Sequence, residues 1–200
     1  MTIRRWGLAA LTAAGWLVAG PAYSAPMLYH IEPHYTTLEF VVENMWGTFS
    51  TTGSFARFSG ELLLDLDTPE NSHVDVTAEA ASIVTAWDNA NRMLVSGDYL
   101  DPAQFPTVHY VSERVEKLAP DHVVLHGHLT LRGVTRPVDL DARLKSRHNE
   151  PGVGPVADFV VKGQFEREDF GMTADYPLVA KEVSLRISSY ILLASEDNNG

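Results

Sequence analysis

Apolar and polar residues alternate without a break in Val74-Asp75-Val76-Thr77-Ala78-Glu79-Ala80. Alternation with a period of two places the valines and alanines on one face of a β-strand. A second clear example is Val138-Asp139-Leu140-Asp141-Ala142-Arg143-Leu144. Further strand-like segments, separated by turn residues, lie at 38–43, 48–58, 61–67, 107–115, 123–131, 157–165 and 183–193. The sequence therefore predicts an all-β protein.

Eight or nine strands that each carry one apolar face must hide that face from water. An antiparallel meander closed into a barrel does this and leaves no open sheet edge. Glu150-Pro151-Gly152-Val153-Gly154-Pro155 predicts a tight loop between two of the strands. Trp87, Asn91 and Leu94 fall near helical spacing, so one helix is expected within 85–99, followed by a turn over 98–106.

The first 24 residues have the pattern of a secretory signal peptide. Arg4 and Arg5 form a basic start, residues 6–19 form an apolar run, and small residues precede a cut after Ser24. The general secretory route fits better than the twin-arginine route, and the alternative is an apolar core helix. We therefore expect export to the periplasm and three segments: a signal peptide at 1–24, a single barrel domain at 25–194 and a disordered polar tail at 195–200.

The charge balance and the absence of cysteine narrow the class of protein. The chain has 26 acidic and 15 basic residues, and loss of Arg4 and Arg5 leaves 13 basic residues and a formal charge of −13. Such a charge argues against nucleic acid and against adhesion to anionic lipid. With no cysteine, the chain has neither disulfides nor thiol chemistry. No segment after the first 24 residues approaches the roughly 18 apolar residues of a membrane span.

Several phrases of the sequence, in a fixed order, carry a resemblance to a known family. They are Tyr29-His30-Ile31-Glu32-Pro33-His34, the spacing of Gly53, Phe55, Phe58 and Gly60, the stretch Leu129-Thr130-Leu131-Arg132-Gly133-Val134-Thr135-Arg136-Pro137-Val138, and Arg167-Glu168-Asp169-Phe170-Gly171-Met172. From about Tyr29 to Leu193 the chain resembles the YceI-like family of exported lipid-binding proteins. The resemblance implies an eight-stranded antiparallel, lipocalin-like barrel with one added helix.

The resemblance also implies that the barrel interior holds a polyisoprenoid, a quinone or another long-chain amphiphilic lipid, with no other cofactor. A quinone ligand would imply a membrane redox protein as a partner, and pairing of two barrels into a homodimer stays open. The expected ligand-binding residues are mostly apolar: Phe40, Val42, Asn44, Trp46, Phe55, Leu64, Val76, Trp87, Asn91, Met93, Leu94, Phe105, Leu129, Leu131, Phe170, Met172 and Tyr176. Met45 and Phe49 are further candidates for the wall or its mouth.

The chain departs from the family pattern at four positions that are neutral here. Asn44 stands where many members have a histidine, and Ala90, Asn91 and Met93 stand where an Arg-Asp pair and a histidine are common. A methionine adapts well to a flexible chain, so Met93 would make the opening more apolar. Asn44, Asn91 and Tyr176 are the expected hydrogen-bonding groups for a quinone carbonyl or a hydroxyl.

The sequence also gives a physical reason to expect a hollow barrel. Ala78, Ala80, Gly127 and Ala142 sit on or near the inward register, where small residues leave room for an elongated ligand. The alternative is a filled barrel whose outer surface binds a protein partner.

Enzymatic functions have little support in the sequence. His122, His126 and His128 share one face of a strand, but that face is opposite the apolar one, so they are expected to be solvated. A catalytic zinc site needs a third ligand and an enclosed water. No nucleophile elbow of the G-x-S-x-G type is present. A protein without catalytic activity or a metal is therefore expected, with a metal-dependent enzyme as the less favoured alternative.

Overall fold

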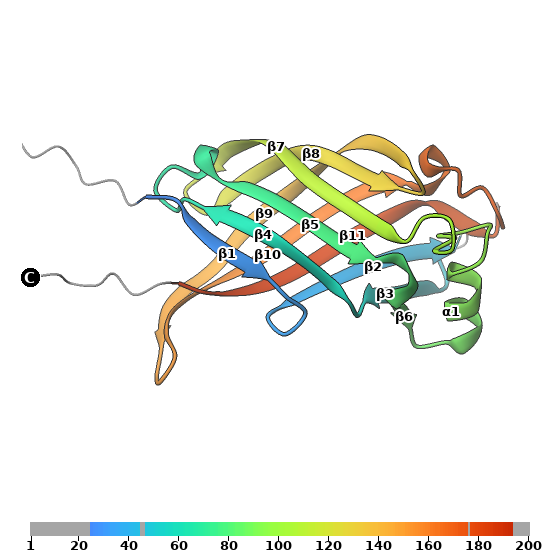
Figure 1. Ribbon diagram of the computed structural model, residues 1–200, viewed down its shortest axis with the longest axis horizontal. Helices are drawn as coiled ribbons and strands as arrows, with labels where there is room; N and C mark the ends of the chain where they lie inside the picture. Colours follow the sequence, from blue (N-terminus) through green and yellow to red (C-terminus); the bar gives the residue numbers. More distant parts are fainter. Residues whose placement is uncertain (1–24, 45–46, 176, 194–200) are drawn as a thin grey trace, which may run out of the picture.

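The computed structural model describes residues 25–44, 47–175 and 177–193, with the side chain of Asn44 excepted (Figure 1). The expected signal peptide and polar tail lie outside the described residues. Strands make up most of these described residues, which also form one α-helix and three short 3-10 helices. In chain order the elements are β1 (Met27–Ile31), β2 (Thr36–Asn44), β3 (Ser50–Phe55), β4 (Phe58–Leu64), η1 (Pro69–Asn71), β5 (His73–Glu79), η2 (Ala80–Ser82), β6 (Ile83–Thr85), α1 (Asp88–Leu94), β7 (Thr107–Ala119), β8 (His122–Leu131), β9 (Val134–Glu150), β10 (Gly154–Glu166), η3 (Arg167–Phe170) and β11 (Val179–Leu192).

All eleven described strands belong to one antiparallel sheet in the order β1-β4-β5-β7-β8-β9-β10-β11-β2-β3-β6. The eleven strands include three pairs that are consecutive along the chain: β1 and β2, β3 and β4, and β5 and β6. The two members of each pair lie beside the same neighbouring part of the sheet. β1 and β2 both pair with the β3–β4 segment, and β5 and β6 pair with its other side. If β1–β2, β3–β4 and β5–β6 are each counted as one interrupted strand, the pairing runs through eight strands and returns to its start. The expected antiparallel barrel is confirmed, and the larger strand count comes from these interruptions.

A buried serine connects the break between β3 and β4 to the break between β5 and β6 by hydrogen bonds. Ser82, which is 3% exposed, lies in η2 between β5 and β6. Its Oγ accepts a hydrogen bond from the backbone N–H of Arg57 at 3.0 Å and donates to the carbonyl of Glu79 at 2.8 Å. Arg57 lies between β3 and β4, so the bends in both interrupted strands are joined.

The alternation that predicted the strands is the alternation of the barrel wall. In β5, Val74, Val76 and Ala78 face inward, and Ala78 is 4% exposed. In β8, Leu125, Gly127, Leu129 and Leu131 are buried while the residues between them are partly exposed. The inward space beside Gly127 is occupied, however, because an added Cβ would lie 2.6 Å from the Tyr110 hydroxyl. Gly127 therefore makes room for a tyrosine and leaves none for a ligand.

The stretch from Leu129 to Val138, one of the phrases that carry the family resemblance, forms the β8–β9 hairpin. Arg132 and Gly133 occupy its two-residue turn with positive φ angles of 51° and 71°. Positive φ at both central residues matches the twist of the flanking strands, and a glycine at the second position accepts it without strain. The tight loop expected over 150–155 also joins two strands, since β9 ends at Glu150 and β10 begins at Gly154.

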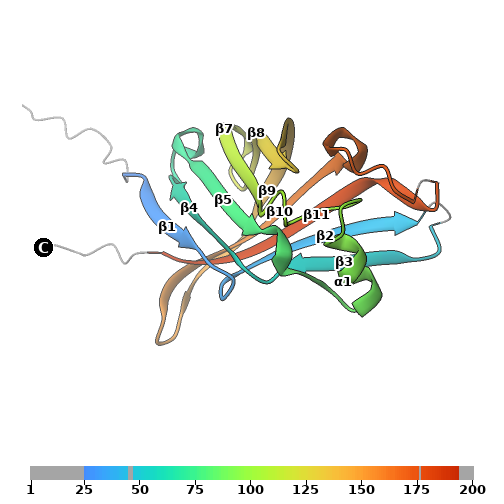
Figure 2. The ribbon, with the colours of Figure 1, turned by 45° about the vertical axis from the view of Figure 1, so that its right-hand side comes forward.

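The helix is shorter than the sequence predicted. It spans Asp88–Leu94, whereas Ile83–Thr85 form the short strand β6 that pairs with β3. Both views of the ribbon place α1 beside β3 at one end of the barrel (Figures 1 and 2). Within the described residues, no helix has the length and apolar composition to cross a membrane.

Candidate functional site

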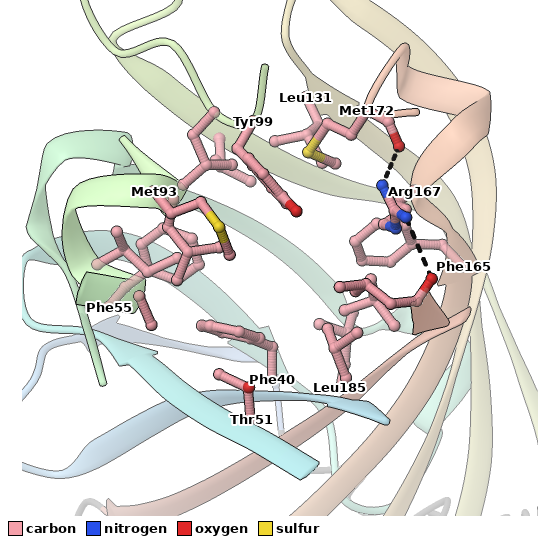
Figure 3. A pocket seen from close by; sticks show the side chains of 18 of the residues that line it. Phe40, Thr51, Phe55, Met93, Tyr99, Leu131, Phe165, Arg167, Met172 and Leu185 are labelled. Carbon is pink, nitrogen blue, oxygen red and sulfur yellow. Dashed lines mark hydrogen bonds between the residues drawn. The ribbon is translucent and has the colours of Figure 1, made fainter. Parts of the chain in front are cut away.

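The barrel interior contains two adjoining apolar cavities. The first, of about 250 Å³, lies at the end of the barrel covered by α1 (Figure 3). The second, of about 380 Å³, extends toward η1 and the β7–β8 turn. Small-molecule pockets usually measure about 300–1,000 Å³. The two cavities together therefore offer space for one elongated ligand.

Five side chains line both cavities and mark the boundary between them: Phe40, Phe55, Val108, Leu129 and Leu185. The ring of Phe40 lies directly on Gly53 of the neighbouring strand, where an added Cβ would come within 2.4 Å of it. Phe40 is only 7% exposed, so its position is set by tight packing. A ligand that reached both cavities would pass between these five side chains.

The first cavity contains one fully buried cation. The Arg167 side chain lines its wall at the start of η3 and is 2% exposed. Its guanidinium donates to three backbone carbonyls, from Nε to Ala180 at 2.9 Å, from Nη1 to Met172 at 2.5 Å and from Nη2 to Val179 at 3.2 Å. Burying a charge is costly unless it is hydrogen-bonded, and these carbonyl oxygens stabilise it.

A tyrosine adds another polar group to this wall. The Tyr99 ring, 5% exposed, lines the first cavity, and its hydroxyl donates to Oδ2 of Asp175 at 2.6 Å. Burial, the hydrogen bond to Asp175 and the charge of that carboxylate together raise the pKa of the Tyr99 hydroxyl well above its ordinary value. Tyr99 therefore remains protonated at neutral pH.

Most of the expected ligand-binding residues line one or both cavities. Those on the first cavity are Phe40, Val42, Phe55, Met93, Leu94, Leu129, Leu131 and Met172. Leu64 and Val76 line the second. Phe49 also borders the first cavity, as does Ala90, one of the neutral positions. Trp46, Met45, Tyr176 and the side chain of Asn44 lie outside the described residues.

Four expected residues are not on either cavity wall. Trp87 precedes α1 and is 70% exposed. The amide oxygen of Asn91 accepts hydrogen bonds from N and Oγ1 of Thr85 at 2.7 and 2.8 Å, so it fastens α1 to β6. Phe105 packs beneath the Arg132 guanidinium, whose carbon lies 5.8 Å from the ring centroid. Phe170 is 1% exposed and packs edge-on against Phe165, behind the wall.

Sequence reasoning missed several residues that line the first cavity. Val183 and Leu185 belong to an alternating segment that was recognised, so their inward position could have been inferred. Arg167 stands in the recognised phrase 167–172, but its acidic neighbours Glu168 and Asp169 give that phrase the composition of a surface turn. Only the three backbone carbonyls around its guanidinium explain its burial.

The histidines of β8 make hydrogen bonds or ion pairs with neighbouring carboxylates. His126 lies 3.0 Å from Asp139 and 3.1 Å from Glu116, and His128 lies 3.1 Å from Glu113. His122 lies 2.5 Å from Asp141 and also borders the second cavity, so it is less solvated than expected. Among the described residues, no group of three or more histidines and carboxylates is placed to hold a metal ion.

Comparison with known proteins agrees with this architecture. A UPF0312 protein of Serratia proteamaculans (strain 568) is 32% identical over 179 residues, which are 89% of this chain and 92% of that protein. The fold is similar to that of Burkholderia cenocepacia BcnA, with a TM-score of 0.72, 18% identity and coverage of 80% of this chain and 99% of that one. It is also similar to a polyisoprenoid binding domain from Saccharophagus degradans implicated in plant cell wall breakdown, with a TM-score of 0.56, 15% identity and coverage of 82% and 97%.

The family comparison covers nearly the whole described domain. The model of the YceI-like domain matches residues 29–190, which include every strand except the ends of the first and the last. The resemblance carried by the scattered phrases of the sequence is thereby confirmed. The chain belongs to the YceI-like family.

Proposed function

We propose that this protein binds a polyisoprenoid or another long-chain amphiphilic lipid inside its barrel. The observation that carries the proposal is the pair of adjoining cavities, whose walls are mostly aliphatic and aromatic. Each methylene group moved from water into such a space contributes about 0.8 kcal/mol. Ten methylene groups would contribute roughly 8 kcal/mol before the entropy of association is subtracted. The polyisoprenoid-binding domain of Saccharophagus degradans, which has a similar fold, supports this ligand class.

The proposal includes export and a role without chemistry. Residues 1–24 act as a signal peptide, and the domain at 25–194 works in the periplasm. The protein carries or sequesters its lipid and returns it unchanged. A membrane redox protein is a partner if the lipid is a quinone. The volume of the two cavities favours this role over a filled barrel that only binds a protein partner.

The test is the identity of whatever the protein retains. The protein is purified from a bacterial periplasm without detergent and weighed intact by native mass spectrometry, and its extract is analysed for lipids. We expect a cut after Ser24 and one molecule with a long hydrocarbon tail per chain. A chain without ligand after gentle purification would contradict the proposal.

A matched pair of variants separates the interior from the surface. Leu129 lines both cavities, so Leu129→Trp should fill the space at their boundary and abolish retention of the lipid. Thr130 follows it in β8, is partly exposed and bonds to Thr135 at 2.8 Å on the other face. Thr130→Trp should retain the lipid, and equal loss in both variants would argue against binding inside the barrel.

A further inference from the structure

The buried arginine of the first cavity has no ionic partner in the described part of the chain. Among the described residues, no carboxylate lies within 4.0 Å of the Arg167 guanidinium, whose hydrogen bonds all go to backbone carbonyls. An arginine stays charged at any pH at which the protein is folded. A positive charge therefore lies in the wall of a mostly apolar cavity, although a purely apolar ligand would need no such group there.

The guanidinium also has more donors than the described residues use. It carries five N–H groups, and three of them are engaged by the carbonyls of Ala180, Met172 and Val179. Nη1 and Nη2 each retain a second N–H, for which the described part of the chain supplies no acceptor. Arg167 borders the cavity, so these two unused donors belong to a residue of its wall.

Tyr99 complements Arg167 from another part of the same wall. Figure 3 shows the Tyr99 hydroxyl pointing across the cavity toward the side on which Arg167 lies. The proton of this hydroxyl is donated to Asp175, so the Tyr99 oxygen can act toward a ligand only as an acceptor. The cavity thus offers donors at Arg167 and an acceptor at Tyr99.

The charges around the cavity favour an uncharged ligand group over an anion. Glu43 also lines the first cavity, and Asp175 bonds to Tyr99 at its edge, so two carboxylates accompany one guanidinium. We propose that Arg167 and Tyr99 form the headgroup site of the bound lipid, and that this headgroup is an uncharged oxygen group, a ketone or an alcohol. The inference rests on the proposed lipid binding, and it orients the ligand with its head in the first cavity and its tail in the second.

The first experiment compares three ligands that share one C15 isoprenoid chain: farnesol, the hydrocarbon farnesene and farnesyl phosphate. Their affinities for the delipidated protein and for Arg167→Met are measured by displacement of Nile red. We expect the ratio of farnesol to farnesene affinity to fall about ten- to hundredfold in Arg167→Met, the effect of losing a hydrogen bond from a charged donor. Farnesyl phosphate should bind the unaltered protein no more tightly than farnesol.

Each of the other outcomes overturns a specific part of the argument. An unchanged ratio with equal losses for both ligands would make Arg167 a purely structural residue. Tighter binding of farnesyl phosphate would replace the uncharged headgroup with an anion. If the delipidated protein binds none of the three ligands, the proposed lipid binding itself fails. Arg136→Met, at an exposed arginine of β9, is the matched control and should leave the ratio unchanged.

A second measurement does not depend on a variant that folds. The isoprenoid ketone farnesylacetone is bound to the unaltered protein, and its carbonyl stretch is recorded by infrared difference spectroscopy. A hydrogen bond from a guanidinium lowers the stretching frequency relative to that of the ketone in hexane. A frequency equal to the hexane value would show that the carbonyl lies away from Arg167 and would overturn the headgroup site.

Discussion

Gly53 shows how a single residue can determine the shape of the ligand space. An added Cβ at this position would lie 2.4 and 2.5 Å from two ring atoms of Phe40 and 2.8 Å from the Val84 carbonyl. Because the carbonyl cannot retreat easily, the Phe40 ring would move into the cavities that it borders.

We expect Gly53→Ala to lower the free energy of unfolding by about 1–3 kcal/mol, as overpacked cores do. Farnesol binding should weaken at the same time, because the ring then occupies ligand space. Gly97→Ala is the matched control, since an added Cβ there meets nothing within 4 Å. Urea denaturation measures the stability and Nile red displacement measures the binding. If Gly53→Ala is destabilised but binds farnesol normally, the position of the Phe40 ring does not affect ligand binding.

Asp65 makes the stability of the fold depend on pH in the acidic range. This buried carboxylate accepts hydrogen bonds from the backbone N–H groups of Thr68 at 2.7 Å and Asp67 at 3.1 Å, and from the Asn71 side chain at 3.0 Å. The bond from Thr68 is the largest influence, and together these bonds hold the pKa of Asp65 below its ordinary value of 3.8 despite burial. The folded state therefore favours the ionised form.

The resulting stability is fully present above the unfolded pKa and is lost as the pH falls through the folded one. Asp65→Asn should lower the free energy of unfolding by about 1–3 kcal/mol at pH 7. It should also flatten the decline of stability below about pH 4. Glu70→Gln, at an exposed carboxylate of the same turn, should keep the decline. Urea midpoints measured from pH 7 downward would refute the assignment if Asp65→Asn and the unaltered protein fell in parallel.

At the scale of elements, α1 covers the first cavity, and its side-chain hydrogen bonds to the barrel go to the neighbouring strand β6. Ala90, Met93 and Leu94 line the cavity, while Asn91 bonds to Thr85 of β6. The helix has only seven residues, and isolated helices of that length are unstable in water. The contact with β6 is therefore needed to hold the cover in place.

Removing that contact should loosen α1 without unfolding the barrel. We expect Asn91→Ala to raise amide exchange in α1 about five- to thirtyfold, the effect of 1–2 kcal/mol, while exchange in β8 and β9 stays unchanged. Asn89→Ala is the control, because Asn89 is an exposed residue of the same helix whose side chain accepts a hydrogen bond from Arg92 of that helix. Hydrogen exchange with mass spectrometry makes the comparison, and a uniform increase over the barrel would contradict the local role of Asn91.

The elements differ in how well their boundaries could be predicted from the sequence. Segment 74–80 was recognisable because each inward residue is apolar and each outward residue is polar. The break at η2 was not, since Ala80 is buried and continues the alternation while the backbone already turns around Ser82. The predicted helix began too early, because Thr85 pairs with Gly53 and belongs to strand β6.

At the scale of the whole molecule, the ring of strands was predictable and its polar contacts were not. Periodicity identifies which side chains face inward, so Leu129, Leu131 and Val76 could be placed near the ligand space. Periodicity carries no information about which polar side chains form hydrogen bonds with other parts of the protein and which face the ligand space. Asn91 was therefore expected at the ligand and bonds to Thr85, whereas Arg167 was overlooked and borders the cavity.

The hollow interior also predicts how strongly the whole fold responds to its ligand. A ligand that binds only the folded state stabilises it by about 2.7 kcal/mol at a concentration one hundred times its Kd. For a domain of about 170 residues this corresponds to a rise in Tm of about 5–10 °C. We expect delipidated protein to melt at a lower temperature than protein as purified, and farnesol to restore the difference. Differential scanning calorimetry measures the shift, and Leu129→Trp, whose cavities are obstructed, should show none. Equal melting temperatures with and without lipid would mean that the cavities stay empty in solution.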